Sequence, residues 1–206
     1  MICLEHFAPV VAGSGLYEGI SVKVLPGQIL PVMGASGSGK TSLLNAVRGQ
    51  LPHVGSVSVS RHDIFSVFQH HDQLFPWFTN QHNLDLVCHR PYRPLAHKWS
   101  VNLLLQRYPS EISVGQRQRL VLLRGVCSGR PVLLCDEPLS AVDDLTAVAI
   151  ARDFRDLVAQ LGIACVWVTH NLIEARILGH QVMVIDSGMV RMVDARELEN
   201  IFCPTA

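Results

Sequence analysis

Apolar runs and amphipathic segments alternate along the chain, which predicts strands and helices that follow one another. Residues 19–25 (GISVKVL) alternate between apolar and polar side chains, as in a strand with one exposed face. Residues 131–135 and 163–168 are continuously apolar, which is typical of strands buried on both faces of a parallel sheet. Further strand-like runs lie at 29–34, 56–60 and 64–69. This order predicts an α/β fold with a mainly parallel sheet and a small antiparallel part.

The pattern changes between Leu74 and Ser110. This stretch contains aromatic residues, several prolines and only short helical patches. It predicts a short helical subdomain, at about residues 74–125, inserted into the core of a single domain that spans residues 1–206. A chain of 206 residues is long enough for such a domain to bury a substantial core.

Composition limits the classes of function. Charged residues make up 17% of the chain and the formal net charge is zero, which argues against a broad electrostatic grip on nucleic acid or anionic lipid. No apolar run approaches the ~20 residues that a membrane-spanning helix needs, and residues 1–7 lack a signal-peptide pattern. We therefore expect a cytoplasmic chain. A positive mean hydropathy with so little charge predicts a surface that partners partly cover.

Cysteine and histidine spacing does not predict a metal site. The six cysteines are scattered without a C-x-x-C pair, so we expect reduced thiols. His70 next to His71, and Cys88 next to His89, are neighbours without further spaced ligands. A structural metal usually needs ligands at such spacing.

The first chemical motif is GASGSGKT, residues 34–41, which fits G-x-x-x-x-G-K-[ST] between an apolar strand and a helical pattern. Glycines let the backbone N–H groups surround phosphate oxygens, and the helix N-terminus favours negative charge. Lys40 would reach the β- and γ-phosphates of a nucleotide, and Thr41 would bind Mg²⁺. The expected phosphate-binding residues are Gly34, Ala35, Ser36, Gly37, Ser38, Gly39, Lys40, Thr41 and Ser42.

Two further strands predict functional residues at the same sheet edge. The apolar strand PVLLC ends in Asp136 and Glu137, and ACVWVT ends in His170. Ligands of open α/β sheets bind at the carboxyl ends of the strands. We expect Asp136 to hold Mg²⁺ through water, Glu137 to polarise the attacking water and His170 to contact the γ-phosphate.

Together with the segment SVGQRQR, residues 113–119, these motifs resemble the ATP-binding cassette (ABC) ATPase family over about residues 4–192. The resemblance implies that Gln69 meets Mg²⁺ and the attacking water. It identifies residues 140–143 (SAVD) as a D-loop, which links the two sites of a dimer. It also implies that Ser113, Gly115 and Gln116 of one chain cover the γ-phosphate held by the other.

The opening of that helix also has a local explanation. Ser113 is a favourable N-cap, and Gln116 occupies the capping-box position three residues later. The exposed N–H groups of a helix start suit a phosphate from a partner chain. Val114 stands where the family usually has glycine, whereas Gly115 keeps the second glycine, so we expect a weakened but intact clamp.

Other positions depart from the family pattern. The aromatic residue that stacks on adenine should lie near Val11, where Phe7 and Tyr17 are the nearest candidates. Pro31 falls in what should be a central strand, where proline removes a ladder donor. Gly125 stands where alanine is common and should cost about 1 kcal/mol of helix propensity.

The resemblance implies an ATPase with ATP and Mg²⁺ as cofactors, which energises transport through closure of a dimer, a homodimer being the simplest case. Expected partners are membrane permease subunits and a substrate-binding protein, with no nucleic acid, and the expected location is the inner face of the cell membrane. Phe75, Trp77 and Phe78 either lie near the permease groove or fill the subdomain core. The alternatives are a cassette that acts on DNA or ribosomes, a small-molecule phosphotransferase and a cassette that binds ATP without hydrolysis.

Overall fold

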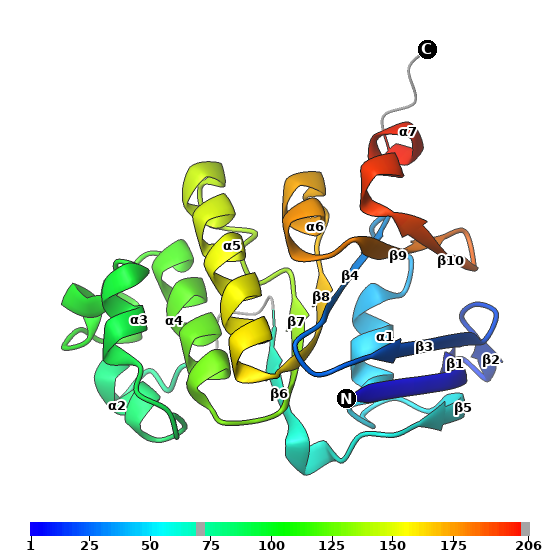
Figure 1. The fold of residues 1–206 in the computed structure, drawn as a ribbon. Coiled ribbons are helices and arrows are strands. Elements are labelled where there is room, and N and C mark those ends of the chain that lie inside the picture. Colours follow the sequence, from blue (N-terminus) through cyan, green and yellow to red (C-terminus); the bar gives the residue numbers. More distant parts are fainter. Residues whose placement is uncertain (69–72, 203–206) are drawn as a thin grey trace.

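The computed structural model describes residues 1–68 and 73–202. A six-stranded sheet forms its centre, with the strand order β10-β9-β4-β8-β7-β6 (Figure 1). All neighbouring strands are parallel except β9 and β10. The strands are β4 (Ile29–Gly34), β6 (Ile64–Val67), β7 (Val132–Asp136), β8 (Ala164–Val168), β9 (Gln181–Asp186) and β10 (Met189–Asp194). The predicted strands at 29–34, 64–69, 131–135 and 163–168 are thus present within two residues.

A smaller antiparallel sheet surrounds β1 (Ile2–Val11), which pairs with β2 (Ser14–Gly15), β3 (Ile20–Val24) and β5 (His53–Val57). Sequence patterns identified β3 but not β1. The strand expected at 56–60 is displaced, because its described pairing with β1 runs from His53 to Val57. The Ser60 side chain instead accepts from His62 N–H and begins a 3-10 turn at Arg61–Asp63.

Alternate residues of the central strands face two hydrophobic layers. Leu133 and Cys165 pack with Phe154 of α5, whereas Val132 and Val166 pack in a second core with residues of α1. Figure 1 shows α5 and α6 standing side by side, and α1 next to the antiparallel sheet. The helices are α1 (Lys40–Val47), α2 (Asn80–Asp85), α3 (Arg93–Lys98), α4 (Val114–Cys127), α5 (Asp144–Leu161), α6 (Leu172–Leu178) and α7 (Leu198–Phe202).

Short helical elements occupy the segment expected to be mostly helical. It holds α2, α3 and two 3-10 turns at Asn102–Leu104 and Pro109–Glu111, and with α4 these lie at the opposite end of the molecule from β1 (Figure 1). Leu84, Trp99 and Leu120 join a hydrophobic core that continues into α5 and the central sheet. The subdomain boundary at 74–125 therefore stays a prediction.

Pro31 lies in the interior strand β4 without breaking the ladder. Gln28 and Val32 carbonyls accept from Cys165 and Thr169 on the β8 side, so the alternation of the strand turns residue 31 towards β9. On that side the pairing begins only at Val32 with Met183. The proline ring occupies this gap beside Gly179, where an added Cβ would lie 2.7 Å from Pro31 Cδ. The missing N–H is tolerated because no partner strand faces it.

Among the helices of residues 1–68 and 73–202, none combines the length and apolar character that crossing a bilayer demands.

Candidate functional site

The loop between β4 and α1 wraps closely around its own backbone. Gly39 has a φ of 101°, in the left-handed region that glycine adopts readily. A Cβ on Gly34 would collide with the carbonyl oxygen of Ile185 on β9. Gly39 is therefore required for its backbone conformation, and Gly34 is required because no space is left for a side chain.

Lys40 is held over this loop. Its Nζ donates to the carbonyl oxygens of Gly34 and Ala35 over 2.8 and 2.7 Å, and only 8% of the residue is exposed. A cavity of about 360 Å³ opens here, and it is lined by Gly34, Ser36, Gly37, Gly39, Lys40, Thr41, Ser42, Glu137 and His170. Ala35 and Ser38, also expected phosphate contacts, lie in the same loop, where Ser38 N–H donates to Ala35 O over 3.2 Å. Three segments that are distant in sequence thus meet at one polar cavity.

Thr41 and Asp136 form an oxygen pair at the edge of this cavity. Thr41 Oγ1 donates to Asp136 Oδ2 over 2.8 Å, although the residues are 95 positions apart. Asp136 ends β7 and is only 6% exposed. A hydroxyl and a carboxylate are hard oxygen donors of the kind that Mg²⁺ prefers.

Glu137 and His170 lie opposite each other at the ends of β7 and β8. His170 Nδ1 and Glu137 Oε2 are 3.2 Å apart. Glu137 has a φ of 46°, which is rare for a residue other than glycine, and its N–H donates to Val168 O over 3.0 Å. Strained backbone of this kind is concentrated at functional sites. The Glu137 side chain is 19% exposed, so it is largely shielded while it faces the cavity.

Gln69 lies outside the described residues. Gln73 is the first described residue after this segment, and its side chain contacts the residues before it. Its Oε1 accepts from Phe68 N–H over 2.8 Å and its Nε2 donates to Ser66 O over 2.9 Å. The guanidinium of Arg48, at the end of α1, lies 4.1 Å from the centre of the Phe68 ring. Burial lowers the pKa of Arg48, and the negative charge of Asp136 opposes that shift. Sequence reasoning did not identify Arg48 or Gln73, whose contacts depend on the tertiary fold.

The start of α4 forms the expected capping box. Ser113 Oγ accepts from Gln116 N–H over 3.3 Å, and Gln116 Oε1 accepts from Ser113 N–H over 2.9 Å. Val114 is the first helical residue. Ser113, Gly115 and Gln116 do not belong to the residues that line the cavity of their own chain.

Gly115 and Gln118 connect α4 to the segment 140–143. A Cβ on Gly115 would lie 2.5 Å from the carbonyl oxygen of Ala141. Gln118 is 5% exposed, and its side chain accepts from Ala141 N–H over 2.9 Å and donates to Ser140 Oγ over 3.1 Å. Sequence reasoning missed Gln118, for which its place on the buried face of α4 was the available signal.

Glu174 is a second residue that the sequence did not reveal. It is 4% exposed on α6, where its Oε2 accepts from Thr169 Oγ1 over 2.8 Å and from Trp167 Nε1 over 3.2 Å. Burial raises the pKa of Glu174, and the hydrogen bonds from Thr169 and Trp167 partly offset that rise. This carboxyl group thus anchors the strand end that carries His170.

Neither candidate for the adenine platform is available. Phe7 is fully buried and Tyr17 is 7% exposed, so neither ring can offer a free face to a base. Tyr17 instead packs beneath the loop, with its Cε1 at 3.6 Å from the position of a Cβ on Gly39. Val11, the position indicated by spacing, is 40% exposed at the end of β1.

Comparison with curated proteins identifies ATP-binding proteins of import systems. The chain is 33% identical over 189 residues to the aliphatic sulfonates import ATP-binding protein SsuB of Ralstonia nicotianae, a match that covers 86% of this chain and 66% of the relative. It is 31% identical to the nitrate import ATP-binding protein NrtC of Synechocystis, which covers 83% of this chain and 28% of the relative. The match to the sulfate/thiosulfate import ATP-binding protein CysA of Bradyrhizobium diazoefficiens, at 30% identity, covers 87% and 59%. The chain therefore spans less than two thirds of the length of these relatives.

Solved structures share the fold. An ATP-binding subunit of an ABC transporter superposes with a TM-score of 0.84 at 18% identity, over 98% of this chain and 93% of that one. A bacterial ABC transporter cassette solved as a dimer gives a TM-score of 0.80 at 24% identity, over 95% and 99%. These likenesses confirm the predicted α/β cassette fold.

A sequence model described as ABC transporter matches residues 17–140, more than half of the chain. This range contains the glycine-rich loop, the start of α4 and the Asp136–Glu137 pair. Together with relatives at 30% identity or more over most of the chain, it confirms the resemblance that the sequence motifs carried. The chain belongs to the ABC transporter family.

Proposed function

We propose that this chain binds and hydrolyses ATP in order to energise solute import through separate membrane subunits. The observation that carries the proposal is the single polar cavity where Lys40, Thr41, Glu137 and His170 meet. A phosphate-binding loop, a carboxylate and a histidine in this arrangement suit phosphoryl transfer to water.

Each residue has a role in this proposal. The Lys40 ammonium neutralises charge on the β- and γ-phosphates, and the loop N–H groups of residues 34–42 bind phosphate oxygens. Glu137 accepts a hydrogen bond from the attacking water and orients it. His170, at 3.2 Å from Glu137, contacts the γ-phosphate and holds the carboxylate in position. Gln69 keeps its proposed role at the metal and the water.

The donor set at the cavity edge suits Mg²⁺. Thr41 and Asp136 already bring a hydroxyl and a carboxylate oxygen within 2.8 Å of each other. We propose that these two residues hold the ion, Asp136 through water. Bound there, Mg²⁺ supplies charge neutralisation on the phosphate oxygens.

The start of α4 is proposed to act on a partner chain. Ser113, Gly115 and Gln116 are at the helix opening and away from the cavity of their own chain. In a head-to-tail dimer of two copies, the exposed N–H groups of α4 would cover the γ-phosphate held by the other copy. ATP then favours the closed dimer by as much as it binds that state more tightly.

An aromatic surface supports a membrane partner. Trp77 is 66% exposed and Phe75 is 41% exposed, and their ring centres lie 5.6 Å apart. Phe78 completes the cluster at 6.1 Å from Phe75. Exposed apolar patches of this kind mark interaction sites. We propose that a cytoplasmic loop of a permease binds here, that the chain lies at the inner face of a membrane, and that a substrate-binding protein delivers the solute.

The names of the relatives favour import. Nitrate, sulfonate and sulfate/thiosulfate proteins are all described as import ATP-binding proteins. These relatives agree in the direction of transport and differ in the solute. The proposal therefore extends to the direction of transport and not to the solute.

Co-purification tests the proposal. The chain is expressed with an affinity tag in its source cells, and membranes are extracted in mild detergent. We expect a multi-span membrane protein to be retained with the wild type and lost with Trp77→Ser, while both variants hydrolyse ATP at the same rate in isolation. Retention of ribosomes or DNA in place of a membrane protein would support the rival function and contradict ours.

A further inference from the structure

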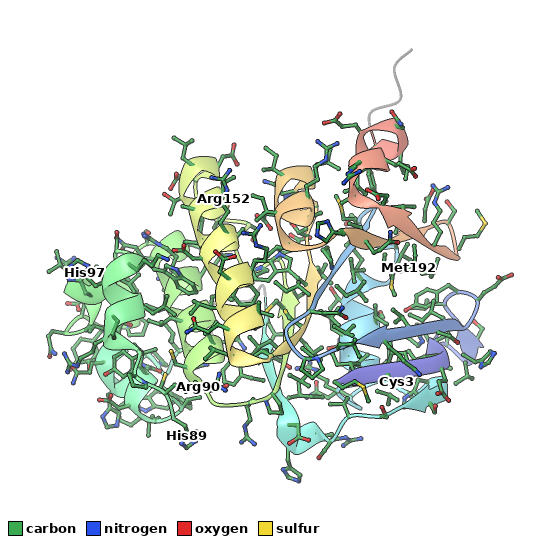
Figure 2. The ribbon with its side chains drawn as sticks, viewed as in Figure 1. Cys3, His89, Arg90, His97, Arg152 and Met192 are labelled. Carbon is green, nitrogen blue, oxygen red and sulfur yellow. The ribbon has the colours of Figure 1, made fainter. Side chains whose placement is uncertain are left out.

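Two cysteines lie close together in the helical part of the molecule, outside the nucleotide cavity. Cys127 is the last residue of α4, and Cys88 follows α2. The N–H groups of His89 and Arg90 donate to the Cys127 carbonyl oxygen over 2.8 and 3.1 Å. Since His89 N is bonded directly to the carbonyl carbon of Cys88, these contacts hold the two cysteine backbones side by side. Figure 2 shows His89 and Arg90 along the edge of the helical part.

The two thiols interact with each other and differ in exposure. Cys127 is 3% exposed, whereas Cys88 is only partly buried. The hydrogen bond to Cys127, together with burial, raises the pKa of Cys88. The hydrogen bond from Cys88 lowers the pKa of Cys127, against the effect of burial. One thiol therefore acts as a donor that stabilises the thiolate of the other.

A buried cation accompanies the pair. Arg124 is 6% exposed, and none of the ion pairs within residues 1–68 and 73–202 includes it. Its Nε is buried and has no hydrogen-bond partner in the same described part of the chain. A buried cation without a counter-ion is costly. The positive charge of Arg124 favours a thiolate at Cys88, and that of Arg90 favours one at Cys127.

One acidic side chain opposes this arrangement. The charge of Asp85 disfavours a thiolate at Cys88. Asp85 is exposed, however, and its Oδ1 already accepts from Tyr92 Oη over 2.6 Å. Solvent screens an exposed charge more than a buried one, so the buried Arg124 outweighs Asp85. The pKa of Cys88 is raised all the same, because its hydrogen bond to Cys127 and its burial have the larger effects.

We infer that Cys88 and Cys127 form a peroxide-sensitive dithiol, a modification site at which a hydroperoxide oxidises the pair to a disulfide. The Cys127 thiolate attacks the O–O bond, so that an S–O bond forms and hydroxide leaves to take up a proton as water. The second thiol then attacks the sulfenic sulfur, the S–S bond forms and a second water departs with its proton. The two thiols lose two electrons, and the peroxide gains them.

The disulfide would join the segment after α2 to the end of α4. The other end of that helix carries Ser113, the residue proposed to reach the partner's nucleotide. Oxidation would therefore modify α4, the helix that connects the helical part to the proposed dimer interface. This inference stands on the contact between the two cysteines, and it holds whether or not the chain hydrolyses ATP.

The chain contains an internal control. Cys135 of β7 and Cys165 of β8 also interact, since the hydrogen bond between them and above all burial raise the pKa of Cys165. Both are fully buried, and they lie on adjacent strands of the central sheet. The two thiols of this second pair interact, but they are not exposed to solvent. They should therefore stay reduced in the folded chain.

Peptide mapping tests the inference on the full chain. The folded protein receives a short pulse of hydrogen peroxide, free thiols are alkylated, and the digest is analysed by mass spectrometry without reductant. We expect a peptide pair cross-linked through Cys88 and Cys127 that a thiol reductant releases, with Cys135 and Cys165 unlinked. Oxidation of Cys88 to a sulfinic acid without the cross-link, or a cross-link of Cys88 to Cys203, would overturn the proposal.

Variants test the roles of the thiols and the cation. Cys88→Ser and Cys127→Ser should each abolish the cross-link. Arg90→Met removes the cation that favours a thiolate at Cys127 and should slow cross-linking, whereas Arg119→Met removes a cation of α4 and should leave the rate unchanged. Circular dichroism establishes that each variant is folded. An unchanged rate in folded Arg90→Met, or an equal loss in Arg119→Met, would contradict the role of the Arg90 guanidinium.

Discussion

The backbone N–H of Ala141 donates to the side-chain oxygen of Gln118 over 2.9 Å, which fixes the segment after β7 to the helix α4. The side-chain Nε2 of Gln118 donates to Ser140 Oγ over 3.1 Å. Ser140 and Ala141 begin the expected D-loop, and Gln118 lies near the expected dimer contact of Ser113. One buried side chain therefore couples two segments that are proposed to face the partner chain.

Gln118→Ala should uncouple these segments. It removes the acceptor of a partly buried hydrogen bond from Ala141 N–H, which costs about 1 kcal/mol in the free energy of unfolding. We expect ATP hydrolysis to fall at least several-fold while ATP affinity of the single chain stays the same, because the phosphate loop is untouched. Chemical denaturation and steady-state hydrolysis measure the two effects.

Gln106→Ala is the matched control. Gln106 Nε2 donates to Gln81 Oε1 over 2.7 Å at an exposed site, so water replaces the lost bond. Stability and hydrolysis should both stay at the wild-type level. Equal losses in the two variants would show that Gln118 has no special role.

Gly115→Ala should be far more harmful than Val114→Gly. An added Cβ at residue 115 meets the Ala141 carbonyl oxygen at 2.5 Å, and because this neighbour is backbone the overpacking should cost about 1–3 kcal/mol. Val114 is the first residue of α4, and its replacement by the glycine usual in the family should preserve activity. Thermal unfolding and ATP hydrolysis compare the two. A neutral Gly115→Ala would contradict the close packing.

Glu137→Gln should separate binding from hydrolysis. The amide keeps the shape of the side chain but is a far weaker acceptor for the proton of the attacking water. We expect ATP binding to persist, a dimer to accumulate with ATP, and turnover to fall at least ~100-fold. Size-exclusion chromatography with ATP and a phosphate-release assay measure these outcomes, and unchanged turnover would remove Glu137 from the proposed role.

Lys40→Ala, in contrast to Glu137→Gln, should weaken ATP binding itself. Loss of the ammonium removes the charge that faces the phosphates, so nucleotide affinity should fall and hydrolysis with it. Equilibrium binding of a fluorescent ATP analogue measures the loss. Unaltered affinity would count against the assignment of the phosphate loop.

Glu174→Gln should change how stability depends on pH. Because burial raises the pKa of Glu174 in the folded state, the folded chain holds this proton more firmly than the unfolded chain. The stabilisation is therefore complete below the ordinary value of 4.5 and is lost as pH rises through the folded pKa. The wild type should lose stability relative to Glu174→Gln across this window in urea titrations. Parallel pH curves would contradict the effect.

Local patterns in the sequence predicted much of the central sheet and of the phosphate loop. Strands with continuous apolar residues are recognisable because both faces are buried, and the loop motif places Lys40 and Thr41 by covalent spacing alone. The meeting of Thr41 with Asp136 followed from the rule that parallel strands end at one edge. The strand β1 was not predicted, because its irregular register interrupts the alternation of apolar residues.

Contacts between distant segments were beyond such patterns. Gly125 looked like a costly glycine in a helix, yet an added Cβ would lie 3.1 Å from Val67 Cγ2 and 3.3 Å from Phe65 Cδ1. The glycine therefore lets α4 approach β6 closely. Tyr17 was a candidate for stacking on adenine, but its ring is buried beneath the phosphate loop. Both outcomes depend on how elements pack.

The position of Pro31 against Gly179 links two residues that the sequence separates widely. The ring fills the space in front of Gly179, so a larger residue there would meet it at once. A smaller residue at position 31 would open a void between β4 and the start of β9. Substitutions at these two positions are therefore interdependent. A relative with a side chain at the position of Gly179 should carry a residue other than proline at the position of Pro31.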